Sequence, residues 1–232
     1  MRPLMAAFST VEDHRKLIAA YLKATRAITL VAAPVLLIIA FLAEPIVRIT
    51  VGENWSLAAP ILRWLCVVNL ISLPSTMMPA LAMVLDNTRY VAFRMLVEFA
   101  IRAPVTLVGI AYFGLLGAIV SRLLAMLVAY GASMLIAKRL IGATLGAQLN
   151  AFVRPLVASL PMIGFLACVQ PVLVPMAAGV NLVASLALCG GAALLIFWTC
   201  ALVLWQLAEK PDGLEAIVVQ KLSPRRKRAI TP

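Results

Sequence analysis

The sequence predicts an all-α protein, a polytopic membrane bundle of six transmembrane helices. Of its 232 residues, 64% are hydrophobic and only 12% are charged, whereas soluble domains contain about 45–50% apolar and about 25% charged residues. A soluble enzyme is excluded because too few polar side chains are present to cover so much apolar volume. The same composition excludes a disordered chain. Long apolar runs between short polar links therefore indicate repeated crossings of a bilayer.

Six apolar runs reach the length of roughly 20 helical residues that a hydrocarbon core of about 30 Å requires. They cover residues 27–50, 58–85, 91–112, 115–137, 152–174 and 182–207. Glu44 and Arg48 have i, i+4 spacing at the end of the first run and are predicted to form an ion pair. Gly114 and Gly117 indicate a tight reversal between the third and fourth runs, where no charged residue occurs.

The runs and links divide the chain into five parts. We expect a cytoplasmic amphipathic segment at 1–26, four membrane spans within 27–137, a cytoplasmic link at 138–151, two additional spans within 152–207 and a basic cytoplasmic tail at 208–232. Thr10 and Asp13 resemble a capping box that begins a helix. This helix is expected to lie at the membrane surface and to continue into the first span.

The distribution of Lys and Arg predicts the orientation. If the spans alternate, residues 1–26, 86–94, 138–154 and 208–232 lie on the side of both termini and hold 16 Lys and Arg. Residues 44–63, 112–117 and 175–181 lie on the other side and hold 2. Basic residues concentrate on the cytoplasmic side, so both termini are predicted to be cytoplasmic. The net charge of +11 is thus explained by membrane topology, and no nucleic-acid partner is expected. The basic tail could also contact anionic membrane lipids.

The sequence contains few residues suited to catalysis. Four cysteines fall inside the predicted spans without a C-x-x-C pair, and His14 is the only histidine. No phosphate-binding G-x-x-x-x-G-K-[ST] motif is present. We therefore expect no enzymatic activity, no metal site and no cofactor.

Charged residues within the third and fourth runs are the first candidate site. Arg94, Glu98 and Arg102 are spaced i, i+4, i+8 on one helix face. Arg122 lies in the next run and is expected nearer the outer side. Arg94 lies close enough to the inner interface to extend toward it, whereas Arg102 lies close to the bilayer middle. One interpretation is a cationic cavity for an anionic headgroup, with Arg102, Arg122 and Glu98 as substrate-binding residues. The alternative is a structural Glu98–Arg102 pair that holds helices together.

A polar stripe in the second run is the other candidate. Asn69, Ser72 and Thr76 recur at i, i+3, i+7, with Pro74 and Pro79 nearby. A helix that bends at proline and lines a cavity would show this pattern. Side chains that form hydrogen bonds between helices would produce the same polar stripe.

Several segments resemble those of polysaccharide (oligosaccharide) flippases, which belong to the multidrug, oligosaccharidyl-lipid and polysaccharide exporter superfamily. The resemblance covers about residues 1–140, and the last two spans fit a fourteen-helix version. The segments that carry it are Pro3 with residues 9–26, Ala-Glu-Pro-Ile-Val at 43–47, Gly-Glu-Asn-Trp at 52–55, Ala-Ala-Pro-Ile-Leu at 58–62 and Phe-Gly-Leu-Leu-Gly-Ala at 113–118.

This resemblance implies a function and a larger assembly. Such flippases move undecaprenyl-diphosphate-linked oligosaccharides outward across the bacterial inner membrane, for surface polysaccharides such as lipopolysaccharide or exopolysaccharide. They have two six-helix lobes around a central cavity, and often two further helices. The chain resembles only the C-terminal portion of that plan, so residues 27–137 would be part of one lobe. An N-terminal lobe, or a partner that supplies it, is then expected. No site residue is transferred from the family, because much of its charged cavity comes from helices outside this chain.

Three other functions are consistent with parts of the sequence. A multidrug antiporter of the same superfamily would favour acidic cavity residues, but Glu98 is outnumbered by Arg102 and Arg122. A membrane-embedded transferase or polymerase would need a carboxylate or histidine constellation and a sizeable outer loop. A non-catalytic membrane scaffold of polysaccharide assembly is the third alternative.

Overall fold

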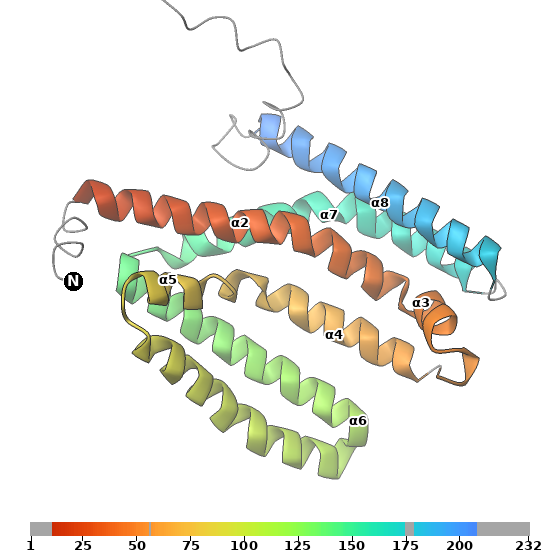
Figure 1. Cartoon of the computed structure of the whole chain (residues 1–232), viewed down its shortest axis with the longest axis horizontal. Coiled ribbons are helices and arrows are strands. Elements are labelled where there is room, and N and C mark those ends of the chain that lie inside the picture. Colours follow the sequence, from red (N-terminus) through yellow and green to blue (C-terminus); the bar gives the residue numbers. More distant parts are fainter. Residues whose placement is uncertain (1–10, 56, 175–178, 208–232) are drawn as a thin grey trace, which may run out of the picture.

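A computed structural model describes residues 11–55, 57–174 and 179–207, and this part of the chain consists of helices and turns (Figure 1). The all-α prediction is confirmed. The elements are α2 (Val11–Phe41), α3 (Ala43–Thr50), η1 (Glu53–Trp55), α4 (Ala58–Ser72), η2 (Leu73–Ser75), α5 (Met78–Val84), α6 (Arg89–Ile141), α7 (Leu145–Leu173) and α8 (Val180–Leu207). Thr10 and the basic tail at 208–232 lie outside the described residues.

Six helical stretches are long and apolar enough to cross a membrane, as the sequence predicts. The protein is therefore a multi-pass membrane protein. The stretches are Arg15–Phe41, Ala58–Val84, Arg89–Gly114, Gly117–Ile141, Leu145–Leu173 and Val180–Leu204.

The first span ends earlier than the apolar run predicts. Helix α2 ends at Phe41, and a separate helix, α3, begins at Ala43 instead of continuing the span to Thr50. Pro45 explains the break, because it lacks the N–H that would bond to the carbonyl of Phe41 four residues earlier, and its ring clashes with that carbonyl. Helix α3 carries the predicted ion pair, with Arg48 Nη2 3.4 Å from Glu44 Oε1.

The second span bends where the prolines predict. Helix α4 ends at Ser72, the 3-10 turn η2 includes Pro74, and α5 has Pro79 in its first turn. A proline inside a helix removes one backbone donor and leaves a carbonyl without its usual partner. Ser72, Ser75 and Thr76 satisfy carbonyls here, each donating its hydroxyl to the carbonyl three residues earlier at 2.7–2.8 Å.

Helix α6 is a hairpin of two antiparallel arms that reverse at Gly114. This glycine has φ 57° and ψ −135°, a backbone conformation that is strained for residues with a Cβ. Close to the reversal, Gly109 and Gly117 bring the two backbones into direct contact, so that a Cβ on either glycine would clash with the other. Ser121 Oγ donates a hydrogen bond to the carbonyl of Val105 at 2.9 Å and thereby fixes the register of the arms. The predicted reversal is confirmed.

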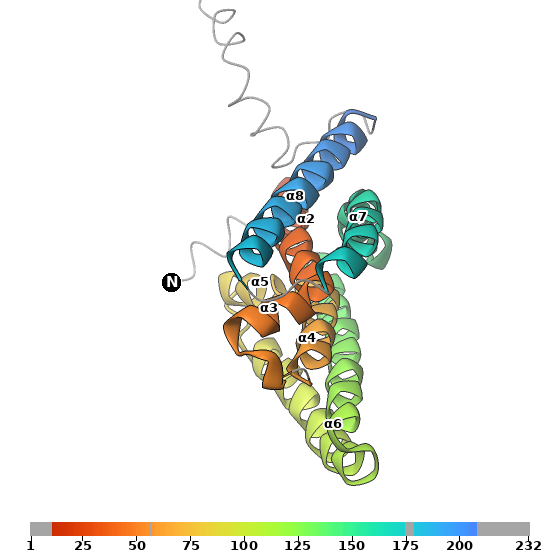
Figure 2. The same ribbon diagram turned by 90° about the vertical axis from the view of Figure 1, so that its right-hand side faces the viewer.

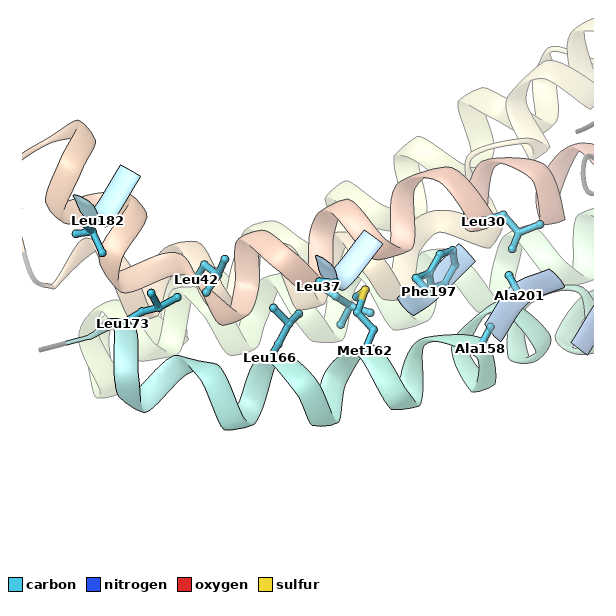
Figure 3. Packing of buried hydrophobic residues seen from close by; sticks show 11 residues of the cluster. Leu30, Leu37, Leu42, Ala158, Met162, Leu166, Leu173, Leu182, Phe197 and Ala201 are labelled. Carbon is cyan, nitrogen blue, oxygen red and sulfur yellow. The ribbon is translucent and has the colours of Figure 1, made fainter. Parts of the chain in front are cut away.

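The helices form layers, with α7 and α8 on one side, α2 in the middle, then α4 with α5, and the α6 hairpin on the far side (Figure 2). The largest core cluster lies between α2, α7 and α8, where side chains of the three helices point toward one another (Figure 3). Its buried members include Leu37, Met162, Leu166 and Phe197. Inside a bilayer such a cluster stabilises the fold through van der Waals packing, since lipid is as apolar as the core.

Candidate functional site

A polar network joins the bend of the second span to both arms of the α6 hairpin. Arg94 Nε donates a hydrogen bond to Ser133 Oγ at 2.8 Å, and Arg94 Nη2 lies 3.5 Å from Ser75 Oγ. Arg94 Nη2 also forms an ion pair with Glu98 Oε2 at 3.8 Å. We call Ser75, Arg94, Glu98 and Ser133 the Arg94 network. It connects three segments that are far apart in the sequence.

The Arg94 network corrects two sequence-based expectations. The side chain of Arg94 is only 13% exposed and turns toward the neighbouring helices, so it does not extend toward the interface. Glu98 pairs with Arg94, and no ion pair between Glu98 and Arg102 is present in the described structure. The i, i+4 spacing allows either pairing. The hydroxyls of Ser75 and Ser133 decide between them, because they hold the Arg94 guanidinium beside Glu98.

Arg102 lies on an uncovered face of the hairpin. Arg102 is exposed, and no hydrogen bond or ion pair links it to another described residue. No residue in the most apolar part of its span is buried, and Phe99 nearby is 72% exposed. A guanidinium near mid-bilayer costs at least about 2.5–3.5 kcal/mol, so this face requires water, a ligand or another protein surface.

Arg122 lies at nearly the same level on the second arm. The Ser121–Val105 hydrogen bond places Arg122 within about one helical turn of the level of Arg102. Its Nε atom is buried and finds no hydrogen-bond acceptor among the described residues. The hairpin thus places two cationic side chains at nearly one depth, which corrects the expectation that Arg122 lies nearer the outer side.

The polar stripe of the second span leads to the Arg94 network. Asn69 and Thr76 donate their side-chain hydrogen bonds to carbonyls of their own segment. Ser72 donates to the carbonyl of Asn69, and the carbonyl of Ser72 accepts a hydrogen bond from Ser75. The stripe therefore stabilises the bend, and Ser75 links it to Arg94.

An apolar crevice of about 520 Å³ opens between the two α6 arms, close to their reversal. It is lined mainly by apolar side chains, including Val108, Phe113 and Val120, and includes none of the predicted site residues. In the described parts of the chain, His, Cys, Asp and Glu form no group of three or more that could hold a metal ion.

A match to a known family covers the first quarter of the chain. Residues 2–60 match the model of a family described as polysaccharide biosynthesis protein. The match supports a polysaccharide flippase-type family. The protein is thus a membrane protein related to polysaccharide biosynthesis. No curated protein and no solved structure matches the chain.

The family match ends before the candidate site begins. Residues 2–60 correspond to α2, α3 and the start of α4 within the described structure, whereas the Arg94 network, Arg102 and Arg122 lie beyond residue 60. Sequence reasoning missed Ser75 and Ser133 as partners of Arg94. Ser75 was detectable, because it lies between Pro74 and Thr76 of the polar stripe. Ser133 has no such signal, since nothing in the fourth run indicates which face meets Arg94.

Proposed function

We propose that the chain forms part of a transporter that flips undecaprenyl-diphosphate-linked oligosaccharide across the inner membrane for surface polysaccharide biosynthesis. The observation that carries the proposal is Arg102, an exposed guanidinium in a span whose most apolar stretch has no buried residue. A guanidinium binds phosphate groups such as a diphosphate through charge-assisted, often bidentate hydrogen bonds. The polysaccharide biosynthesis family of the N-terminal segment supports this class of substrate.

The charges within the spans favour an anionic substrate over a cationic one. Glu98 is the only acidic residue in the six candidate spans, and its carboxylate is paired with Arg94. A multidrug antiporter would use an intramembrane carboxylate to attract a cation or carry a proton. Here Arg102 and Arg122 contribute the positive charge, which suits a diphosphate.

The proposal includes a second lobe. Helices α4 and α5 pack against one side of the α6 hairpin, and no described residue covers the face that carries Arg102. Alternating access moves one half of a transporter against the other around a site near mid-membrane. A second lobe facing Arg102 and Arg122 would complete the cavity and would cover the exposed span.

The experiment compares Arg102→Ala with Arg102→Lys in a complete transporter that contains this segment, expressed in a flippase-deficient cell. Surface polysaccharide and protein abundance are both measured. Arg102→Ala should lose most of the polysaccharide at normal abundance. Arg102→Lys should retain part of it, because the charge survives without the bidentate geometry.

Lys138→Ala is the matched control, since this exposed basic residue lies in the last turn of α6, outside the candidate cavity. It should leave surface polysaccharide unchanged. Normal polysaccharide with Arg102→Ala at normal abundance would contradict the proposal and would leave Arg102 as a water-exposed bystander.

A further inference from the structure

A basic groove lies between α2 and α7, away from Arg102 and Arg122 of the α6 hairpin. It has a volume of about 300 Å³. Its charged and polar lining residues are Lys23 and Arg26 of α2, and Asn150 and Arg154 of α7, while alanines and one leucine line the rest. None of the described residues that line it is acidic. The groove is therefore a concave, cationic surface.

Helix geometry brings these side chains together. Lys23 and Arg26 are three residues apart, and Asn150 and Arg154 are four apart, so each pair lies on one helix face. The two helices pack side by side and run in the same direction, as the paired positions of their core residues show (Figure 3). Small alanines along the contact leave space between them. Arg154 Nη2 also donates a hydrogen bond to the carbonyl of Leu204 in α8 at 2.8 Å, which holds its guanidinium beside the groove.

The groove lies at the boundary between charged and apolar parts of these helices. One turn beyond Arg26 and Arg154 come Leu30 and Ala158, which belong to the apolar core cluster. There the space between the helices narrows to a cavity of about 10 Å³. A ligand can therefore place a charged group against the two arginines but cannot extend further between the helices. Lipid phosphates lie at this boundary of a bilayer.

The start of α7 adds to the positive potential. Ala147, which lines the groove, lies in the first turn of α7, because the helix begins at Leu145. The N-terminal end of a helix carries a partial positive charge that favours anions. The charge, the depth and the shape of the groove thus all favour an anionic ligand at the membrane surface.

We propose that this groove binds the phosphate of an anionic membrane phospholipid, with the headgroup between Lys23, Arg26 and Arg154. The charged residues that line the groove are all cationic, so a zwitterionic lipid, which brings its own cation, should bind less well. Such a lipid would join α2, which carries much of the family-matched segment, to the additional helices α7 and α8. This site is separate from the proposed transport cavity, and its test does not involve transport.

The test is native mass spectrometry of the full chain in detergent, with phosphatidylglycerol or phosphatidylcholine of identical acyl chains. Phosphatidylglycerol should remain bound at concentrations where phosphatidylcholine does not. Each basic residue near a membrane surface contributes about 1 kcal/mol toward anionic lipid, so Lys23→Gln should weaken binding about fivefold. Lys23 is exposed, and this change should leave the melting temperature unaltered.

Arg139→Gln is the matched control, because this exposed arginine lies near the end of α6 and does not line the groove. It should bind phosphatidylglycerol as the unmodified chain does. Equal retention of both lipids, or equal weakening by Lys23→Gln and Arg139→Gln, would overturn the proposal. Displacement of phosphatidylglycerol by inorganic phosphate at the same concentration would also overturn it, since the groove would then select a small anion and not a phospholipid.

Discussion

Arg94 and Ser133, which are 39 residues apart in the sequence, are joined by a hydrogen bond of 2.8 Å from Nε to Oγ. The bond links the two arms of the α6 hairpin, and the same arginine holds Glu98 at 3.8 Å. Inside a membrane bundle, a polar cluster of this kind destabilises the fold if some of its hydrogen-bonding groups lose their partners. The Arg94 network is therefore expected to determine how the hairpin packs against the bend of the second span.

Replacing Arg94 should destabilise the protein more than replacing Arg102. Arg94→Gln removes the charge that pairs with Glu98 and weakens the bonds to two serines, which should cost about 1–3 kcal/mol. Arg102→Gln removes no contact with a described residue and should leave the melting temperature almost unchanged. Thermal unfolding in detergent measures both.

A double-mutant cycle separates the ion pair from general loss of structure. Glu98→Gln should be less harmful in the Arg94→Gln background than in the unmodified chain, since it then removes an unpaired carboxylate. Strictly additive effects of the two substitutions would show that Arg94 and Glu98 do not interact.

The two glycines near the hairpin reversal provide a second prediction. Gly117→Ala should lower the melting temperature and the amount of inserted protein, because its Cβ would meet the backbone of Gly109. Overpacking of this kind costs about 1–3 kcal/mol. Gly131→Ala is the matched control in the same arm, since a Cβ there has no neighbour within 4 Å. Equal tolerance of both changes would show that the arms are not in close contact.

The apolar runs and punctuating residues were enough to predict most of the fold. Hydropathy predicted six spans, Gly114 predicted the reversal and Pro74 with Pro79 predicted the bend of the second span. The break at Pro45 was missed, because the apolar run continues past it to Thr50. The length of an apolar run does not indicate where a proline removes a backbone hydrogen bond and ends a helix.

The candidate site was less predictable, because it depends on which helices meet. The spacing of Arg94, Glu98 and Arg102 allows two ion pairs, and a serine on the opposite arm selects one of them. Sequence spacing contains no information about Ser133 as a partner. Arg102 and Arg122 were identified because they interrupt apolar runs. Their common level was not predicted, because it depends on how the two arms pair at Ser121 and Val105.

The charge distribution predicts a topology that labelling can test. In a variant without the four native cysteines, single cysteines at positions 53, 115 and 178 should react from outside the cell. Cysteines at 88, 145 and 225 should be protected, because the side with 16 Lys and Arg is predicted to be cytoplasmic. Any two positions on the opposite side would overturn this arrangement.

The two-lobed account predicts that residues 1–232 alone do not restore surface polysaccharide in a flippase-deficient cell. Alternating access requires two lobes that move against each other, and these residues would form part of only one lobe. Co-expression with a first lobe of the same family should restore the polysaccharide. Restoration by this chain alone, in a host without related transporters, would favour a homo-oligomer instead.

The most direct test of the account is the rate at which a diphosphate-linked oligosaccharide lipid crosses proteoliposomes that contain this chain together with a first lobe. If the two lobes form a flippase, the lipid should cross faster than in empty vesicles. Arg102→Ala should slow this transfer when equal amounts of protein are reconstituted. Transfer no faster than in empty vesicles, or uptake of an organic cation in its place, would contradict it.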